Sequence, residues 1–541
     1  MNDCNIANAL SIVAATQGER IALAAKDGRE WRQWTFAQLQ ALSTGLAALL
    51  QKKGIRTGDR VMLMVRPSVE FICLTFALFR IGAVVILIDP GMGYRNLLRC
   101  ISSVRPDILV GIPKAVLFSR LFRQPFQTLR ARIKADKHLL AVAQERREDD
   151  PGLEQRTFQA QSSDLAAIIF TTGSTGPPKG VQYTHGIFAA QLALIRDYFG
   201  IGPDDVDQPG FPLFGLFATA LGAKAVIPDM DPARPAQVDP EKFVRTLLEH
   251  KVTYSFGSPA IWRVVSAYCL ERRIVLPLRQ VLMAGAPVSG ALIEQVRRIL
   301  PPSSRVFTPY GATESLPVAC IEGEEVMNQT WTLTQTGKGT CVGRPLPGMD
   351  IRIIAPVEGP VSSWTDVCEL PAGSIGEIVV RGPVVTKAYD GNARETELAK
   401  IADGKQFWHR MGDMGYLDDQ RRLWFCGRKA HRVITDKEVM YTIPCEALFN
   451  QHPAVLRSAL VGVGCPGKQI PVIVVELRQR LRQKTQFFQE LRQIASGSLH
   501  AHAITLFLIH KGFPVDIRHN AKIFREQLAV WAARRLQLKP G

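Results

Sequence analysis

Residues 168–186, IIFTTGSTGPPKGVQYTHG, join a hydrophobic run to a loop rich in glycine and hydroxyl side chains. The apolar segment 164–170, DLAAIIF, predicts a buried strand that ends directly before the loop. Residues 171–180 then contain three glycines, four threonines or serines, and Lys179. Glycines let backbone N–H groups approach an anion closely, and the hydroxyls and the lysine add donors and positive charge. The loop is therefore predicted to hold phosphate groups.

This loop differs from the P-loop of common NTPases, which requires the pattern G-x-x-x-x-G-K-[ST]. Counted from Gly173, Pro178 stands where the second glycine is required. Gly180 follows Lys179, where the P-loop has serine or threonine. The sequence therefore indicates a different class of phosphate-binding fold.

Strand-like and helix-like segments alternate on the N-terminal side of the loop. Residues 60–65 and 84–89 each predict a buried strand, and residues 69–83 between them predict a helix. Such alternation is typical of parallel sheets covered by helices, so the fold class predicted is α/β.

The chain has 541 residues, which is too long for a single hydrophobic core. A hairpin is predicted to end near Arg428, and the pattern changes after it. Strands are then expected at 458–464, 470–477 and 504–510, with a basic helix from 478 and a final helix from about 523. We expect a large domain over 1–427 and a small α+β domain over 428–541.

Basic residues exceed acidic ones, 66 to 49, for a formal net charge of +17. The charge is dispersed, and no nucleic-acid motif or aromatic-interleaved basic strip accompanies it, so nucleic acid is not expected as a partner. The densest basic stretch, residues 478–493, is interpreted as a helix that buries Leu481, Phe488 and Leu491 and has a basic face. A solvated face, an acidic protein, anionic lipid or a polyanionic cosubstrate such as ATP would each suit this charge.

The cysteine spacing, the interrupted apolar run and the N-terminal residues together indicate a cytoplasmic location. Ten cysteines occur singly, without a CxxC pair, which favours reduced thiols over disulfides or zinc. The longest apolar run, residues 71–88, is interrupted by Arg80, and the N-terminus lacks the cationic start of a secretory signal. His500 and His502 offer only two metal ligands, so a structural role is expected for both.

Four further motifs follow the loop in chain order: MAGAPVS at 283–289, YGATES at 310–315, MGDMGYL to CGRKAHR at 411–432, and HNAKIFREQL at 519–528. Together with the loop, they resemble the adenylate-forming superfamily of acyl-CoA synthetases, peptide-synthetase adenylation domains and luciferases. The resemblance extends through nearly the whole chain. It implies a large N-terminal adenylate-forming domain of layered sheets and helices and a small mobile C-terminal lid.

The resemblance also implies a site for ATP and Mg²⁺. The residues that it assigns to ATP or AMP binding are Thr171, Thr172, Gly173, Ser174, Thr175, Gly176, Lys179, Gly285, Ala286, Pro287, Tyr310, Gly311, Thr313, Glu314, Asp413 and Arg428. Those that it assigns to catalysis are Lys522, Glu314, Thr172 and Lys179. Glu314 and Thr172 are implied as metal ligands, Tyr310 as the ring that stacks on adenine, and Asp413 with Arg428 as ligands of the ribose.

Two departures from the acyl-CoA synthetase pattern concern the second half-reaction. The implied hinge position is Ala430, and no glycine occurs in the following residues 431–449, where that family has a glycine-containing loop beside its pantetheine tunnel. Gly215 occupies the place where many members have a gating histidine. Both departures argue against CoA as the acceptor. Phe214, Gly215, Phe256 and Gly257 are predicted to belong to the acyl pocket.

Longer stretches, such as 225–240, 308–319 and 422–433, resemble one branch in particular, the β-lactone synthetases of bacterial olefin biosynthesis. This resemblance implies ATP-dependent conversion of a long-chain 2-alkyl-3-hydroxy fatty acid to a β-lactone through an acyl-adenylate, with release of AMP and pyrophosphate. The basic surface would suit a complex with other olefin-pathway enzymes, with at most peripheral membrane contact. A long-chain acyl-CoA synthetase and an inactive scaffold remain alternatives. His185 is one candidate for the base that accepts the hydroxyl proton, and a packing histidine at the start of a helix is an equally good interpretation.

Overall fold

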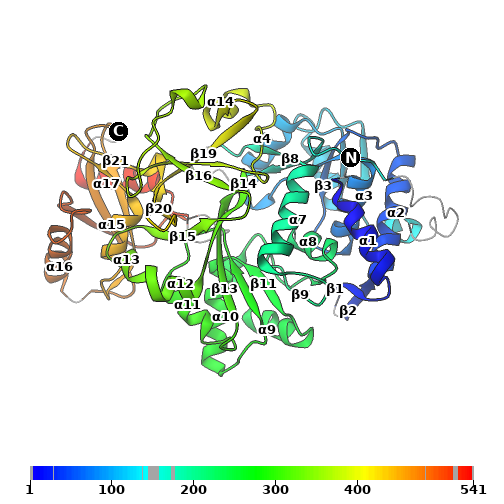
Figure 1. Cartoon of the computed structure of the whole chain (residues 1–541), viewed down its shortest axis with the longest axis horizontal. Coiled ribbons are helices and arrows are strands. Elements are labelled where there is room, and N and C mark those ends of the chain that lie inside the picture. Colours follow the sequence, from blue (N-terminus) through cyan, green and yellow to red (C-terminus); the bar gives the residue numbers. More distant parts are fainter. Residues whose placement is uncertain are drawn as a thin grey trace.

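The computed structural model describes the chain apart from residues 1–3, 29, 137, 144–156, 172–176, 212, 482, 516–521 and 539–541. The described residues form two large sheets and one three-stranded sheet, together with a short two-stranded pair (Figure 1). The first large sheet has six strands in the order β6-β5-β3-β4-β7-β8, all neighbours being parallel except β7 and β8. Its strands are β3 (Arg60–Met64), β4 (Val84–Leu87), β5 (Ile108–Gly111), β6 (Ala131–Lys134), β7 (Leu165–Phe170) and β8 (Gly180–Thr184).

The second large sheet has fourteen strands, and the pairing changes from parallel to antiparallel along its length. Its parallel part contains β9 (Val206–Asp207), β10 (Lys224–Val226), β11 (Tyr254–Gly257), β12 (Gln280–Met283) and β13 (Arg305–Ala312). Its antiparallel part contains β14 (Ser315–Glu322), β15 (Thr340–Pro345), β16 (Asp350–Ile354), β17 (Gly376–Arg381), β18 (Lys400–Asp403), β19 (Gln406–Leu417) and β20 (Leu423–Arg428). The antiparallel pair β1 (Ile21–Asp27) and β2 (Glu30–Thr35) closes the parallel end.

Helices pack between and around these sheets, which confirms the predicted α/β class. The helices of the N-terminal part are α1 (Ile6–Gln17), α2 (Phe36–Lys52), α3 (Val69–Ile81), α4 (Tyr94–Val104), α5 (Pro113–Leu121), α7 (His185–Phe199), α8 (Phe214–Ala220), α9 (Pro240–Glu249), α10 (Pro259–Arg272) and α11 (Gly290–Arg297). One hydrophobic cluster joins side chains of both large sheets through α3, α7 and α8.

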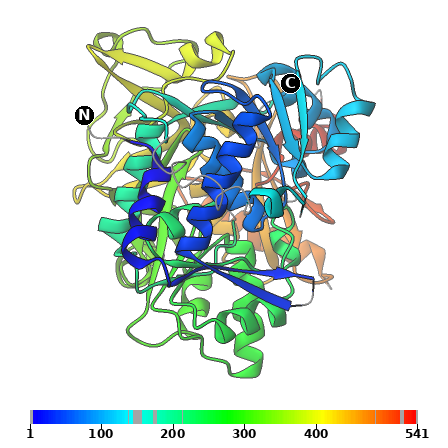
Figure 2. The same cartoon turned by 90° about the vertical axis from the view of Figure 1, so that its right-hand side faces the viewer.

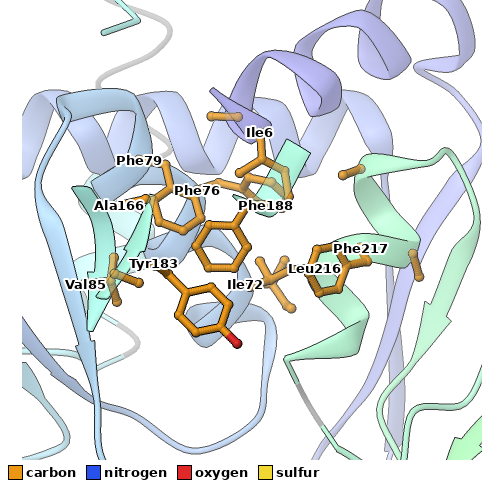
Figure 3. Close-up of a cluster of buried hydrophobic side chains, with 14 of the residues drawn as sticks. Ile6, Ile72, Phe76, Phe79, Val85, Ala166, Tyr183, Phe188, Leu216 and Phe217 are labelled. Carbon is orange, nitrogen blue, oxygen red and sulfur yellow. The ribbon is translucent and has the colours of Figure 1, made fainter. Parts of the chain in front are cut away.

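Helix α3 shows how this core forms around a chain segment that is apolar almost throughout. The Ser68 side chain accepts a hydrogen bond from the Phe71 N–H at the start of the helix, and Gly82 ends it in a left-handed conformation at φ 76°. In Figure 3, Ile72, Phe76 and Phe79 pack beside Phe188 of α7. The run that Arg80 interrupts is therefore a buried helix followed by a buried strand, as predicted.

The Arg80 guanidinium tolerates burial because polar groups surround it. It donates to Gln40 Oε1 at 2.5 Å, to Ser11 Oγ at 2.8 Å and to Thr157 Oγ1 at 2.9 Å. A buried guanidinium is stable only when its N–H groups find such acceptors. Among the described residues, no helix is long and apolar enough to cross a bilayer.

Beyond residue 432 the chain forms a small α+β unit, at the left in Figure 1. After the short pair β21 (Val433–Ile434) and β22 (Val439–Met440), a sheet of β23 (Val455–Val463), β24 (Ile470–Leu477) and β25 (Leu506–His510) packs with α15 (Thr442–Phe449), α16 (Lys484–Ser496) and α17 (Arg525–Leu536). The predicted start of the basic helix was wrong, because α16 begins six residues later, at Lys484. Its fully buried positions are Phe487, Leu491 and Ala495, whereas Phe488 is only partly buried.

All ten cysteines are free thiols, and most are buried, as the unpaired spacing predicts. His500 and His502 lie in a turn rather than on a strand. Within the part of the chain that the structure describes, no group of three or more histidine, cysteine and acidic side chains is placed to hold a metal.

Candidate functional site

A cavity of about 1990 Å³ runs between the two large sheets and the C-terminal unit. It brings together predicted residues that are far apart in the sequence. Those that line it are Thr171, Lys179, Phe214, Phe256, Gly285, Gly311, Thr313, Glu314, Arg428, Ala430 and Lys522. Ala286, Pro287, Gly215, Gly257, Tyr310 and Asp413 are not on its wall.

The glycine-rich loop is closed at its base by two hydrogen bonds. The Thr171 N–H donates to the Lys179 carbonyl at 3.0 Å, and the Lys179 N–H donates to Thr171 Oγ1 at 3.2 Å. The predicted ligands Thr172, Gly173, Ser174, Thr175 and Gly176 lie outside the described residues. Lys179 Nζ pairs with Glu395 and lies 5.0 Å from the ring centroid of Tyr389, so its positive charge faces the cavity beside the loop.

Glu314 is held at both its backbone and its side chain. Its carbonyl accepts hydrogen bonds from the Thr386 N–H at 2.9 Å and the Thr386 hydroxyl at 3.0 Å. The Tyr389 hydroxyl donates to Glu314 Oε1 at 2.7 Å. Burial and the Glu314 charge raise the pKa of Tyr389, which keeps the hydroxyl protonated as a donor. Lys179 contacts the same tyrosine, and a carboxylate fixed in this way fits an oxygen ligand of Mg²⁺.

Asp413 and Arg428 face each other across the antiparallel pair β19 and β20. Arg428 Nη1 lies 3.0 Å from Asp413 Oδ1, and the Tyr310 hydroxyl donates to Asp413 Oδ2 at 2.6 Å. Burial raises the pKa of Asp413, and the charge of Arg428 opposes this increase. The carboxylate thus fixes both the tyrosine and the arginine, and Arg428 extends to the cavity wall.

Lys522 reaches the same cavity from the C-terminal unit. Its neighbour Ile523 bridges to Val515, which anchors the segment on that unit. Burial raises the pKa of Asp413, and the Lys522 charge opposes this increase. The ammonium therefore lies within electrostatic range of that carboxylate. Ala430 lies in a short 3₁₀ turn, Lys429–His431, between β20 and β21. Lys522 and Glu314 therefore both line this cavity, although they come from different parts of the chain.

Lys400 and His409 were missed by the sequence analysis. Lys400 Nζ lies 3.1 Å from His409 Nδ1 and donates to the carbonyl of Thr386, the residue that binds Glu314. Burial lowers the pKa of Lys400 to about 7 and also lowers the pKa of His409. No spacing pattern relates position 400 to position 314, so only the fold reveals this support. Tyr389 and Glu395 were missed for the same reason.

The inner part of the cavity is apolar and rich in aromatic rings. Its walls include Phe188, Phe199, Phe214, Phe217 and Phe256, and the rings of Phe214 and Phe256 stack with centroids 4.0 Å apart. Gly257 lies behind this wall, where a Cβ atom would approach Trp262 Nε1 to 2.7 Å. Gly215 has more room, since its nearest neighbours would lie 3.6 Å from a Cβ. The chamber is suited to long alkyl chains.

His185 is not placed to serve as a base. It is fully buried at the start of α7 and lies between the rings of Phe79 and Phe158, at centroid distances of 5.6 and 6.2 Å. It is not on the cavity wall. Of the two roles that the sequence left open, the structure favours a packing histidine at a helix start, because the chain turns into α7 and directs the imidazole into the core.

Asp207 is a buried carboxyl group in the apolar chamber. It is 1% exposed, and neither carboxylate oxygen has a hydrogen-bond partner of good geometry among the described residues. Its neighbour on the adjacent strand is Tyr254. Burial raises the pKa of Asp207 well above its usual value, so the group favours the protonated form in the folded protein.

Replacing Asp207 by asparagine is expected to remove a pH-dependent loss of stability. Because the pKa is raised in the folded state, the wild-type protein loses stability as the pH rises above about 4, where the unfolded carboxyl ionises. The loss is about 1.4 kcal/mol for each pH unit until the folded group also ionises. Thermal unfolding followed upward from about pH 4 should therefore favour Asp207→Asn increasingly, until the folded carboxyl also ionises. The exposed Asp204→Asn serves as control, and parallel curves for all three proteins would contradict the expectation.

Comparison with known proteins places this site in a family. Residues 10–390 match the family described as AMP-binding enzyme. The chain is 44% identical to an olefin beta-lactone synthetase of Xanthomonas campestris pv. campestris, over 98% of each chain, and 42% identical to one of Stenotrophomonas maltophilia, over 99% of each. A long-chain-fatty-acid–CoA ligase of Thermus thermophilus is 24% identical over 87% of this chain and 86% of the ligase.

Solved structures show the same fold. ATP-bound MatB from Rhodopseudomonas palustris superimposes with a TM-score of 0.78 at 20% identity and covers 99% of this chain and 100% of its own. The o-succinylbenzoate CoA synthetase of Bacillus subtilis in complex with ATP and magnesium gives a TM-score of 0.74 at 23% identity, over 96% and 99% of the two chains. From the family match and the near full-length identity, we conclude that this chain belongs to the AMP-binding enzymes.

Proposed function

We propose that this protein converts a long-chain 2-alkyl-3-hydroxy fatty acid into a β-lactone, with consumption of ATP and release of AMP and pyrophosphate. The observation that carries the proposal is the continuity of one cavity from the cluster of Lys522, Glu314 and Arg428 to the aromatic chamber. Near full-length identity of 42–44% to proteins named olefin beta-lactone synthetase supports it. The CoA ligase named above is only 24% identical, which makes an acyl-CoA synthetase the weaker alternative.

In the first half-reaction, a carboxylate oxygen of the acid attacks the α-phosphorus of ATP, and the bond to the pyrophosphate oxygen breaks. Negative charge grows on the phosphate oxygens, and preorganised positive groups stabilise it best. Lys179 and Lys522, which line the cavity, are proposed to supply that charge. Arg428 is proposed to hold the ribose, together with the Asp413 carboxylate that lies 3.0 Å behind it. Glu314 would hold Mg²⁺ in the bound state, where the ion would neutralise phosphate charge.

In the second half-reaction, the 3-hydroxyl oxygen of the same substrate attacks the acyl carbon. The bond between the acyl carbon and the phosphate oxygen breaks, AMP leaves, and the hydroxyl proton is released. Since nucleophile and electrophile belong to one molecule, the effective concentration of the hydroxyl can reach about 10⁵ M or more. Such a reaction requires no thiol tunnel, in keeping with the absence of glycine from residues 431–449. The apolar walls would exclude water from the adenylate.

The unit beyond Arg428 is proposed to act as a mobile lid, with Ala430 in the hinge and domains of residues 1–427 and 428–541. The 3₁₀ turn at Lys429–His431 supports this, because it joins the last strand of the large sheet to the small unit. We further propose that the enzyme works in the cytoplasm, with the possibility of a complex with other enzymes of olefin biosynthesis.

Analysis of the reaction product would test the proposed function. The protein is incubated with ATP, Mg²⁺ and a long-chain 2-alkyl-3-hydroxy acid, with and without CoA, and the extracted product is identified by NMR. A β-lactone formed equally well without CoA is the expected result. A matched acid without the 3-hydroxyl should give the adenylate and no lactone. A thioester formed only with CoA would instead establish an acyl-CoA synthetase.

A further inference from the structure

Helices α4 and α5 cover the same side of the six-stranded sheet. Both contribute to one hydrophobic cluster with β3, β4 and β5, through Leu97 and Ile101 of α4 and Val116 of α5. Their opposite sides face outward, and Figure 2 shows this light-blue region at the right-hand edge of the molecule. The exposed surface of α4, α5 and the residues directly after α5 is called the α4–α5 face below.

Large apolar side chains are exposed on the α4–α5 face. Leu117 and Leu121 of α5 are 57% and 71% exposed, Phe122 is 41% exposed, and Tyr94 at the start of α4 is 73% exposed. Phe118 links them, because its ring centroid lies 6.0 Å from that of Tyr94 and 4.6 Å from that of Phe122. Leu117 and Leu121 follow the spacing i, i+4, so they lie on one outward side of α5, whereas Phe118 is half-buried beside them. A contiguous exposed apolar patch of this kind marks an interaction surface.

Exposed basic side chains share the α4–α5 face with these apolar residues. The exposed ones are Arg95, Arg99, Lys114, Arg120 and Arg123. None of the five forms an ion pair with a residue that the structure describes. Between residues 90 and 134 the chain has one acidic residue, Asp107, whose carboxylate accepts a hydrogen bond from the Arg60 N–H at 2.8 Å. The positive charge of the face is therefore not neutralised locally.

We propose that the α4–α5 face docks on the surface of an anionic lipid bilayer. Apolar side chains that enter the acyl region, surrounded by cations that meet lipid phosphates, are the chemistry by which a peripheral protein recognises such a membrane. A nucleic acid would leave Leu117 and Leu121 without an apolar partner. The face is distinct from residues 478–493, the stretch of densest basic charge in the sequence.

The position of the face next to the cavity favours lipid over a protein partner. Tyr94, Lys114 and Phe118 belong both to the α4–α5 face and to the wall of the cavity. An acid with long alkyl chains partitions into bilayers, so a docked enzyme would meet its substrate at the cavity entrance. This last step rests on the proposed function, whereas docking itself does not.

Vesicle sedimentation without ATP or acid tests the docking. Wild-type protein is expected to sediment with phosphatidylcholine vesicles that contain phosphatidylglycerol, but not with phosphatidylcholine alone, and high salt should release it. Arg120→Glu with Arg123→Glu should weaken binding at least about tenfold, since each cation near an anionic surface contributes about fivefold in affinity and two are lost. Leu117→Ser with Leu121→Ser should weaken it by about tenfold or more through lost apolar burial.

The matched control is Arg297→Glu with Arg298→Glu, a pair at the C-terminal end of α11. It reverses the same number of charges elsewhere and should bind vesicles as the wild type does. Equal loss in the control, or wild-type protein that stays in solution with both vesicle types, would overturn the proposal and leave the face to a protein partner. Circular dichroism establishes that each variant is folded.

A second measurement compares AMP formation from acid embedded in vesicles with AMP formation from the same acid in detergent. The α5 variants should be slower only with vesicles. Equal rates on vesicles would overturn the role in substrate loading. Failure of the wild type in both media would contradict the proposed function and leave the vesicle-binding result unaffected.

Discussion

Replacing Lys522 by alanine is expected to slow pyrophosphate release by roughly 10²–10³-fold, the usual effect of removing one preorganised group that stabilises transition-state charge. Lys522 lies on the wall of the cavity within electrostatic range of Asp413. It comes from the C-terminal unit, so its removal leaves the phosphate-binding loop and Glu314 in place. Release of pyrophosphate in the presence of ATP, Mg²⁺ and acid measures the effect.

Lys511→Ala is the control for this prediction, because Lys511 is an exposed lysine of the same unit. It should release pyrophosphate at the wild-type rate. Unfolding curves for both variants should match the wild type, since neither lysine contributes to the core. If Lys522→Ala retains full activity, Lys522 has no role in adenylation.

Replacing Glu314 by glutamine is expected to raise the Mg²⁺ concentration needed for half-maximal activity by at least about 10–100-fold, the loss caused by removing even an outer-shell partner of a metal. Glutamine keeps the shape of the side chain, and its carbonyl oxygen can still accept the hydrogen bond from Tyr389. The variant therefore removes the negative charge with little change in geometry. Titration of pyrophosphate release with Mg²⁺ measures the shift.

The exposed Glu324→Gln is the matched control, and its Mg²⁺ titration should superimpose on that of the wild type. An unchanged titration for Glu314→Gln would remove Glu314 from the metal site. A lower maximal rate with an unchanged Mg²⁺ midpoint would lead to the same conclusion.

The sequence predicts much of the fold because local signals determine it. Buried strands such as β3 and β7 are short apolar runs, and α3 begins and ends at recognisable caps. The start of α16 was placed too early because residues 478–483 are as polar as the helix that follows. Only their local conformation separates the two segments.

The site is less predictable because it depends on contacts between distant segments. Tyr389 binds Glu314 directly, and Lys400 binds it through Thr386, although both lie more than seventy positions away in the sequence. No local sequence pattern predicts either contact. Nothing in the sequence distinguishes Asp207 from an exposed aspartate, and only the fold shows that it is buried. For His185, adjacency to the loop left a catalytic and a packing role open, and only its burial against Phe79 favours packing.

The contact between Gly257 and Trp262 has a consequence for engineering the enzyme. Any side chain at position 257 would press on the indole of Trp262, which is fully buried. Enlarging this residue would therefore disturb the core before it reshaped the acyl chamber. Libraries aimed at altered chain-length preference should keep Gly257 and vary Phe214 and Phe256, whose stacked rings form the chamber wall itself.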